Sequence, residues 1–397
     1  MKILFLAPEP FFELRGTPIN IKHLLEVAGE QGNKIDLLTY HIGRDIHLQN
    51  VKICRILRVP FIKYVPIGPS RAKIILDCIL FIKALQMVMV IKYDCIHAVE
   101  ESVFIAFLLG KLFRIPFIYD MDSCISDQLS YTGKLRNRHI LRVVRFLEGL
   151  ALRNSAVVLT VCSALTELAG RIAPSKKIFQ IEDCPVELPR VNTKFSRESF
   201  GLRCDDLVVM YAGNFESYQG VEILLKSMSY FLKCQKDGIR GNSLAHCGIK
   251  LVLAGGEPDQ IEMLKSFASR LGILHSVLFL GKHPMEEIPS LLSLADILVS
   301  PRLEGTNTPM KIFDYLASGR AVVATNLPMH TQVLSKKTAV LCKPDPECFG
   351  KGILKLAGDE GYRKKLSEEG KRLVESRYSP AFFRERVSRV YEFVNGL

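Results

Sequence analysis

The sequence predicts an α/β protein built from two doubly wound parallel-sheet domains. Its 397 residues exceed what one hydrophobic core usually serves, so two domains are expected. Short apolar runs alternate with longer stretches of helical period, a pattern typical of parallel sheets with helices on both faces. This alternation occurs twice, and residues 181–205 between the two series mix prolines and charges without a sustained period.

The first series predicts an amino-terminal domain over residues 1–185. Its apolar runs are short and bounded by turn residues, as strands are, and the stretches between them are long enough for crossover helices. The expected strands are 2–7, 34–38, 51–56, 94–98, 117–120 and 156–161, and the expected helices lie near 19–31, 70–92, 101–112, 135–153 and 163–172.

The second series predicts a domain over residues 206–378, followed by a terminal helical segment over 379–397 with its periodic part at 380–394. A polar insertion at 234–248 is expected to be a surface loop, and a charged helix is expected near 359–377. The expected strands are 207–211, 250–254, 277–280, 297–300, 321–324 and 339–341.

Residues 74–91 approach the length of a transmembrane helix. Asp77, Lys83 and Gln86 interrupt them and do not share one narrow face, and a bilayer span with Asp and Lys would be costly. Two interpretations stay open: a crossover helix buried against the sheet, or a helix partly inserted into a membrane surface.

The charge of the chain is concentrated in its first part. Residues 1–180 carry 24 Lys and Arg against 15 Asp and Glu, whereas the remainder carries 29 against 26. This basic excess indicates an anionic surface or substrate as partner. Nucleic acid is the competing interpretation, but no helix-turn-helix, zinc finger or aromatic-studded basic strand accompanies the charge, so no nucleic-acid partner is expected.

The eleven cysteines are odd in number, scattered and without a C-x-x-C pair, which favours ordinary thiols of a reducing compartment over disulfides or zinc. No signal peptide is visible at the amino terminus. We therefore expect a cytoplasmic protein, with peripheral attachment to the inner face of the membrane as a further hypothesis.

Residues 300–325 predict a ligand site. They follow an apolar strand, pass through a small polar loop and then reach Thr308 and Pro309, which are expected to cap and open a helix. A helix start presents unpaired N–H groups and favours an anion. A phosphate and a polyhydroxylated group would both fit this loop, because charges of both signs surround it at Glu304, Lys311 and Asp314.

The first strand leads into a loop that contains Gly16 and reaches a helix start at Thr17 and Pro18. This arrangement positions N–H groups toward a phosphate, although an ordinary capped turn explains it as well. The dinucleotide fingerprint G-x-G-x-x-G is absent.

Polar residues also end the next two strands of this domain. His97 is either a hydrogen-bond donor to a sugar hydroxyl or a structural strand residue, and Glu100 and Glu101 follow it. Asp120 and Asp122 spell a D-x-D, which holds a divalent cation only with further oxygen ligands or a substrate diphosphate. We expect no metal there.

Landmarks of a known family occur in order along the chain. In the first half they are residues 7–16, 94–97 and 161–163, and in the second half they are 211–214, 277–281, 295–301 and the 300–325 loop. With these, the chain resembles the retaining, GT-B-fold glycosyltransferases of family 4, the group 1 transferases, over essentially its full length. The resemblance implies two Rossmann-like domains facing a cleft, an acceptor-side first domain, a nucleotide-sugar-binding second domain and a terminal helix that packs back on the first.

The family signature E-x7-E is present in modified form. Glu304 matches the first acid, and the second falls on Asp314, with two extra loop residues between them. The resemblance implies that Glu304 lies near the transferred sugar and Asp314 holds the ribose. Asn214 and Gln219 stand where the family commonly has Arg and Lys on the donor diphosphate, and each lost charge-assisted contact is worth about 1.5–3 kcal/mol.

The resemblance implies a metal-independent, cofactor-free retaining glycosyltransferase. It would move a sugar from a nucleotide-diphospho-sugar to a hydroxyl of a glycan or lipid-linked acceptor, in cell-surface polysaccharide or glycolipid synthesis. A non-catalytic GT-B-like nucleotide-sugar-binding or scaffold protein is the alternative, and a nucleotide-sugar epimerase is a third.

The residues expected to carry this function fall into three groups. The catalytic group is Glu304, His97 and Asp120; the donor-binding group is Gly16, Thr17, Asn214, Gln219, Arg302, Gly305, Thr306, Asn307, Thr308, Lys311 and Asp314; and the acceptor-side group is Glu100, Glu101 and Asp122.

Overall fold

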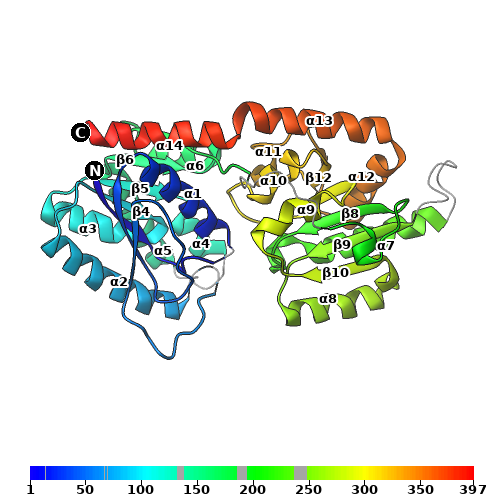
Figure 1. Cartoon of the computed structure of the whole chain (residues 1–397), viewed down its shortest axis with the longest axis horizontal. Helices are drawn as coiled ribbons and strands as arrows, with labels where there is room; N and C mark the ends of the chain where they lie inside the picture. Colours follow the sequence, from blue (N-terminus) through cyan, green and yellow to red (C-terminus); the bar gives the residue numbers. More distant parts are fainter. Residues whose placement is uncertain (14, 67, 69, 132–137, 186–194, 237–247) are drawn as a thin grey trace. The chain divides into compact units, whose positions relative to one another are not determined.

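The computed structural model describes residues 1–13, 15–66, 68, 70–131, 138–185, 195–236 and 248–397 (Figure 1). The chain divides into two compact units. Unit 1 comprises Met1–Asp183 together with Ala381–Leu397, and unit 2 comprises Cys184–Pro380. The insertion expected at 234–248 falls mostly outside the described residues.

Unit 1 is built on a seven-stranded sheet in the order β3-β2-β1-β4-β5-β6-β7, and its neighbouring strands pair in parallel. Its central strands are almost entirely buried and mostly apolar, which is why the sequence located them within about two residues. The short, half-buried edge strand β7 was not predicted. The strands are β1 (Lys2–Ala7), β2 (Lys34–Thr39), β3 (Val51–Arg55), β4 (Cys95–Val99), β5 (Phe117–Met121), β6 (Val157–Thr160) and β7 (Ile178–Gln180).

The helices of unit 1 cover this sheet, and α2 and α3 lie next to each other in Figure 1. The inner side of α2 buries Leu76, Leu80 and Ala84 at a spacing of four residues, as an ordinary crossover helix does. Among the described residues, no helix is long and apolar enough to cross a membrane. The helices are α1 (Gly16–Glu30), α2 (Arg71–Val90), α3 (Val103–Phe113), α4 (Ile125–Tyr131, not predicted), α5 (Arg138–Asn154) and α6 (Ser163–Ile172).

The last helix, α14 (Pro380–Asn395), belongs to unit 1 from Ala381 onward. It is drawn red in Figure 1. Its Tyr391 is 2% exposed and its hydroxyl lies 3.0 Å from His97 Nδ1 in β4. Arg386 pairs with Glu182 and Arg384 with Glu30, so polar and apolar contacts both fix the helix to this unit.

Unit 2 repeats the plan with a six-stranded parallel sheet in the order β10-β9-β8-β11-β12-β13. Its strands are β8 (Leu207–Ala212), β9 (Ile249–Ala254), β10 (Val277–Gly281), β11 (Ile297–Ser300), β12 (Ala321–Thr325) and β13 (Val340–Cys342). Its helices are α7 (Val221–Lys236), α8 (Pro258–Arg270), α9 (Ile288–Leu292), α10 (Lys311–Ala317), α11 (Pro328–Thr331), α12 (Pro346–Gly358) and α13 (Glu360–Arg377).

Each sheet has one point where the strand order reverses. The point lies between β1 and β4 in unit 1 and between β8 and β11 in unit 2. The loops that leave these two strands diverge, and in doubly wound folds ligands bind at the carboxyl ends of the strands there. The predicted α/β fold with two doubly wound parallel sheets is confirmed.

Candidate functional site

The reversal point of unit 2 holds the desolvated amine of a lysine. Lys311, the first residue of α10, donates hydrogen bonds from Nζ to the Tyr211 hydroxyl at 2.7 Å and to Gln219 Oε1 at 3.1 Å. Its Nζ also lies 4.0 Å from the centre of the Tyr211 ring. Burial, with a smaller contribution from the positive charge of Arg302, lowers the pKa of Lys311 well below its usual range. No carboxylate of the described residues contributes to this shift, so the negative charge that would stabilise a protonated Lys311 can come from a bound anion.

Two glycines let the backbone close around this amine. Gly213 follows β8 with φ +150°, and a Cβ there would lie 2.4 Å from Lys311 Nζ. Gly255 follows β9 with φ +119°, and a Cβ there would lie 2.0 Å from the Gly213 carbonyl oxygen. Side chains at either position would push the two strand-end loops apart. The glycines therefore keep the amine and the backbone of the β8 loop in contact.

The loop after β11 is folded around Arg302. Its guanidinium donates to the Glu304 carbonyl at 2.7 Å and to Asn307 Oδ1 at 3.2 Å, and it lies 5.4 Å from the centre of the Tyr218 ring. Gly305 adopts φ +117° with Arg302 Nη2 against its α-carbon. Arg302 thus shapes the loop as well as supplying positive charge.

The helix start predicted at Thr308 and Pro309 is wrong by two residues. The helix α10 begins at Lys311 with Met310 as its N-cap, because a tight turn from Pro309 to Ile312 comes first. Thr308 does not cap the helix: its hydroxyl is buried and has no hydrogen-bond partner among the described residues. The loop is held from outside by Gln332, whose Nε2 donates to the Thr306 carbonyl at 2.8 Å.

The remaining predicted donor residues differ in exposure. Glu304 and Asn214 are exposed, and Asp314 is half-buried on α10. Gln219 is 5% exposed, and its Oε1 accepts from Lys311 Nζ. The prediction that Gln219 contacts the donor directly is therefore corrected: its carbonyl oxygen is used to hold Lys311.

A buried histidine supports the end of β11. Burial lowers the pKa of His330 to about 3, so the ring is neutral. Its Nε2 lies 2.9 Å from Ser300 Oγ and its Nδ1 lies 3.0 Å from the Thr325 carbonyl oxygen. The ring joins the carboxyl ends of β11 and β12 and so fixes the point where the Arg302 loop begins.

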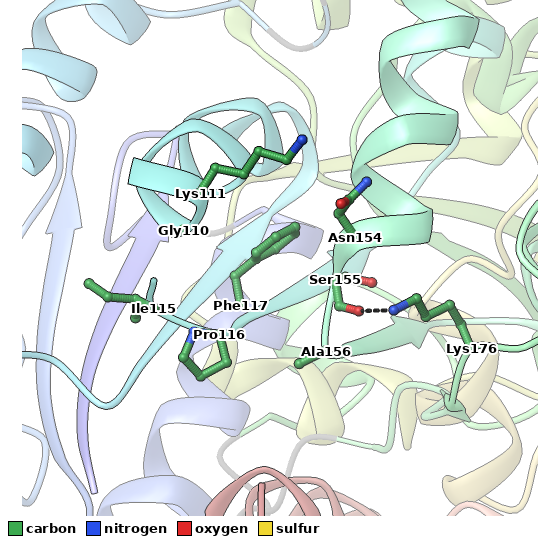
Figure 2. Close-up of a pocket in the computed structure, with 9 residues that line it drawn as sticks. All are labelled: Gly110, Lys111, Ile115, Pro116, Phe117, Asn154, Ser155, Ala156 and Lys176. Atoms are coloured by element: carbon green, nitrogen blue, oxygen red, sulfur yellow. Dashed lines mark hydrogen bonds between the residues drawn. The ribbon is translucent and has the colours of Figure 1, made fainter. Parts of the chain in front are cut away.

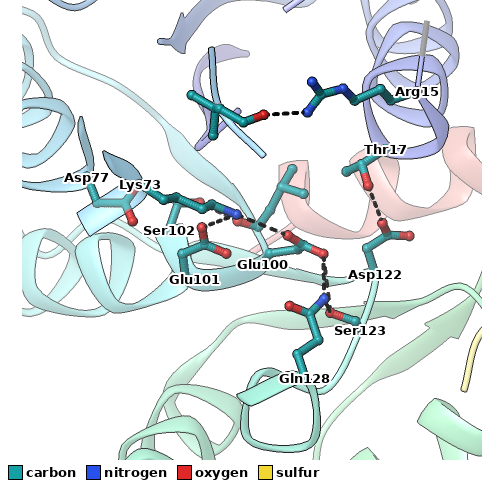
Figure 3. Close-up of polar contacts among 12 residues, drawn as sticks. Arg15, Thr17, Lys73, Asp77, Glu100, Glu101, Ser102, Asp122, Ser123 and Gln128 are labelled. Atoms are coloured by element: carbon teal, nitrogen blue, oxygen red, sulfur yellow. Dashed lines mark hydrogen bonds and ion pairs between the residues drawn. The ribbon is translucent and has the colours of Figure 1, made fainter. Parts of the chain in front are cut away.

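The reversal point of unit 1 carries a buried polar network (Figure 3). Lys73 of α2 lies 2.5 Å from Glu101 Oε1 and 3.8 Å from Glu100 Oε2. Glu100 Oε1 accepts from Ser123 Oγ at 3.2 Å and from Gln128 Nε2 at 3.3 Å. Burial raises the pKa of Glu100 despite these contacts, and Glu100 itself sits at φ +48°.

Two more acids join this network. Burial, followed by the charge of Glu101, raises the pKa of Asp77 to about 7, and Asp77 accepts from the Tyr40 hydroxyl at 2.5 Å. Burial, followed by the charge of Glu100, also raises the pKa of Glu9. Glu9 Oε1 is buried with no hydrogen-bond partner among the described residues. The carboxyl edge of this sheet is therefore acidic, although unit 1 as a whole is basic.

Gly16 and Thr17 form the first turn of α1, as the sequence predicted to within a residue. Thr17 Oγ1 donates to Asp122 Oδ2 at 2.8 Å, and Arg15 Nη1 donates to the Val65 carbonyl at 2.9 Å (Figure 3). The first bond joins the start of α1 to the loop after β5, and the second joins the loop after β1 to the segment between β3 and α2. Asp122 thus lies at the predicted edge.

The catalytic assignment of His97 and Asp120 is corrected. His97 is 0% exposed, and its ring stacks on Phe5 with centroids 4.2 Å apart. Its Nε2 lies 3.2 Å from Asp120 Oδ2, and its Nδ1 lies 3.0 Å from the Tyr391 hydroxyl. One neutral tautomer satisfies both contacts, with Nε2–H donating to Asp120. The pair anchors α14 to the sheet, so neither side chain is available to a substrate.

Outside the two strand-end sites, the described residues provide weaker candidates for a functional site. Among the described residues no group of three or more His, Cys, Asp or Glu side chains could hold a metal ion. A cavity of about 260 Å³ lies at the amino ends of β5 and β6, at the opposite edge of the sheet from the acidic network (Figure 2). It is lined in part by Lys111 and Lys176, but Lys176 Nζ already donates to the Ser155 carbonyl at 2.8 Å.

Sequence reasoning missed several residues of both sites. Tyr211 lies inside a buried strand. Lys73 and Asp77 lie on a helix that is separated in sequence from the strand ends they approach in space. No local sequence pattern therefore marks these three residues. Glu9 carried a signal, since it is an acid placed directly after a buried strand.

Comparisons with known proteins relate the chain to glycosyltransferases. Residues 192–373 match the model of the family described as "Glycosyl transferases group 1". The chain is 24% identical over 384 residues to MJ1607, an uncharacterized glycosyltransferase of Methanocaldococcus jannaschii. The aligned region covers 92% of this chain and 90% of that protein.

Solved structures share the whole architecture. Sucrose-phosphate synthase from Thermosynechococcus elongatus superposes with a TM-score of 0.77 at 17% identity, over 100% of this chain and 99% of that one. Anabaena Alr3699/HepE, solved in complex with UDP-glucose, gives a TM-score of 0.73 at 16% identity over 99% of both chains. The chain therefore has the GT-B glycosyltransferase fold, and its second unit is similar to the group 1 glycosyl transferases.

Proposed function

We propose that the protein is a retaining glycosyltransferase of family 4. It moves a sugar from a nucleotide-diphospho-sugar to a hydroxyl of a glycan or lipid-linked acceptor, in cell-surface polysaccharide or glycolipid synthesis. The observation that carries the proposal is the desolvated amine of Lys311 at the reversal point of unit 2, held by Tyr211 and Gln219 beside Gly213. An amine desolvated in this way is stabilised in its charged form when a diphosphate supplies the missing negative charge.

In this proposal unit 2 binds the donor. The diphosphate lies on Lys311, with Arg302 adding charge and the buried Thr308 hydroxyl a hydrogen bond. The exposed carboxylate of Glu304 orients the transferred sugar, together with the loop Gly305–Thr306–Asn307, and Asp314 takes the ribose hydroxyls. Lys311 thereby replaces the cations that Asn214 and Gln219 do not supply.

Unit 1 takes the acceptor in this proposal. Its strand-end edge offers Glu9, Glu100, Glu101 and Asp122 against one ammonium group, that of Lys73. Carboxylates accept hydrogen bonds from hydroxyl groups and repel a phosphate placed beside them. The acceptor group presented here is therefore a neutral polyhydroxylated sugar, with any phosphate or lipid directed elsewhere.

The chemistry needs no strong protein base. In front-face transfer the leaving diphosphate itself accepts the proton of the attacking hydroxyl, and the new glycosidic bond forms as the sugar–phosphate bond breaks. The protein's work is then to position the two substrates and to stabilise the charge that develops on the diphosphate. Lys311 and Arg302 are placed for the second task. The reaction is proposed to need no metal or cofactor and to take place in the cytoplasm.

The test is transfer of labelled UDP-, GDP- and ADP-sugars to an acceptor in isolated membranes. Glu304→Gln is the variant, because an exposed side chain can be changed without disturbing the fold. Labelled product from the wild type, reduced at least about tenfold in the variant, is expected from the loss of one charged contact. A wild type that binds nucleotide but transfers nothing would instead support the alternative, a non-catalytic nucleotide-sugar-binding protein. Asn214 and Gln219 motivate that alternative.

A further inference from the structure

One face of unit 1 exposes a continuous apolar stripe on α5. Residues three and four positions apart share one side of a helix, whereas the carboxyl-terminal part of α5 is buried in the core through Ala151 and Leu152. A single exposed apolar residue is ordinary, but a stripe marks an interaction surface. Its members are Ile140, Val143, Phe146 and Leu147, which are 46%, 56%, 62% and 41% exposed.

The stripe continues on the two neighbouring helices of the same layer, since α2 packs against α3 and α3 packs against α5. Exposed members on these helices are Ile74, Ile82, Met89, Leu108 and Leu112. We call the exposed side chains of α2, α3 and α5 the apolar helix layer. In the described part of unit 2, by contrast, the large apolar side chains that reach solvent are Met263 and Leu274, so the feature belongs to unit 1.

Positive charge accompanies the apolar helix layer. Arg138, Arg142 and Arg145 of α5 are exposed on another side of the same helix, with Arg142 one turn before Phe146 of the stripe. Lys111 and Arg114 at the end of α3 are exposed as well.

The carboxylates around α5 do not cancel this charge. Glu148, the acid of α5, faces inward, where its Oε1 accepts from the Ile125 N–H at 2.9 Å and from the Tyr119 hydroxyl at 3.2 Å. Asp127 of α4 lies 3.9 Å from Arg145, a loose contact with both side chains exposed to water. The face is thus apolar and cationic together.

We propose that the apolar helix layer docks the protein onto an anionic lipid bilayer. Phe146, Val143 and their neighbours enter the boundary between headgroups and acyl chains, and the arginines of α5 bind lipid phosphates. The charge argues for this occupant, because a second copy of the chain would bring the same arginines against each other. The inference does not depend on the transfer reaction, since the exposed side chains that it uses are not those of either strand-end site.

The experiment is co-sedimentation of the full chain with two kinds of vesicle. One kind is phosphatidylcholine alone and the other is phosphatidylcholine mixed with phosphatidylglycerol. Each arginine near an anionic surface is worth about 1 kcal/mol, so three predict binding on the order of 100-fold tighter to the mixed vesicles. Arg142→Glu with Arg145→Glu is expected to remove this preference. Val143→Ser with Phe146→Ser is expected to weaken binding to both kinds.

The matched control is Met263→Ser, which changes a side chain as exposed as Phe146 but in unit 2, at 61% against 62%. It is expected to bind as the wild type does. Equal sedimentation of the wild type with both vesicles, or with neither, overturns the proposal. So does a wild-type dimer in light scattering that Phe146→Ser converts to a monomer, because a second copy would then cover the face. Thermal unfolding checks that each variant is folded. If Val143→Ser with Phe146→Ser does not fold, the proposal is tested by the vesicle preference of Arg142→Glu with Arg145→Glu, whose side chains are exposed.

Discussion

The side-chain amine of Lys311 donates a hydrogen bond to the hydroxyl of Tyr211 at 2.7 Å, and its Nζ lies 4.0 Å from the centre of the same ring. The Tyr211 hydroxyl in turn donates to the Asn214 carbonyl oxygen at 2.7 Å, so it accepts from the lysine through its lone pair. The two loops that diverge at the reversal point of unit 2 are joined by this chain of bonds. The site is thereby organised before any ligand arrives.

Gly213→Ala tests the close approach of this amine. Its Cβ would lie 2.4 Å from Lys311 Nζ, so the amine must move, and we expect the affinity for nucleoside diphosphates to fall at least about tenfold, as when one charged contact is lost. Gly281→Ala is the control, since Gly281 also has a positive φ, +70°, but a Cβ there meets nothing within 4 Å. Both variants bear a backbone cost of about 1–2 kcal/mol in folding stability. Titration calorimetry measures the affinity of each variant for nucleoside diphosphates and so separates the effect on binding from that shared cost. Equal affinities of the two variants would show that the contact does not matter.

Donor binding is expected to take up a proton. Burial lowers the pKa of Lys311, and an anion bound beside it raises that pKa again, so affinity should fall as pH rises through the titration of the amine. Calorimetry at about pH 8, where a phosphate with a second pKa of about 6 is ionised, in two buffers of different ionisation enthalpy measures this uptake. Lys311→Met should abolish it. Binding without proton uptake would mean that the amine is already charged in the free protein.

The link between His97 and Tyr391 is expected to be structural. Tyr391→Phe removes a buried hydrogen bond to His97 Nδ1, which should lower the free energy of unfolding by about 0.5–1.5 kcal/mol. Chemical denaturation measures this loss. Donor binding should be unchanged, and a variant that is stable but no longer binds or transfers would restore a direct role for His97.

Asp77 gives the stability of unit 1 a distinct pH dependence. Burial raises its pKa to about 7, whereas in the unfolded chain it is about 4, so between these values the native state keeps a proton that the unfolded state has lost. The free energy of unfolding should therefore fall as pH rises across this window, by up to about 1.4 kcal/mol per unit.

Asp77→Asn removes this titration and keeps an oxygen for the Tyr40 hydroxyl. Urea denaturation at several pH values should show the variant gaining on the wild type from about pH 4 to about pH 7. A difference that stays constant across the window would contradict the raised pKa.

The fold could be predicted from the sequence because its signals are local. Strands such as β1 and β8 are unbroken buried apolar runs, and the positions of the strand-end loops follow from them. The edge strand β7 has three half-buried residues and gave no comparable signal.

The contents of the sites depended on contacts far apart in sequence. Lys311 meets Tyr211 across 100 residues, and Lys73 on α2 pairs with Glu101 in a different segment. His97 followed the pattern of a strand-end ligand, yet α14 covers it from 294 residues away. Local propensity also misplaced the start of α10, because the preceding turn uses the residues that normally cap a helix.

The most direct test of the account is equilibrium binding of UDP, GDP and ADP to the wild type and to Lys311→Met. Methionine keeps the length and the apolar packing of the side chain while it removes the charge. Lys365→Met, at an exposed position on α13, is the matched control. The account predicts that at least one nucleotide binds the wild type and the control, and that Lys311→Met binds it about 10- to 150-fold more weakly. Binding that is absent in the wild type, or that is equally tight in Lys311→Met, would contradict a diphosphate site at this strand end.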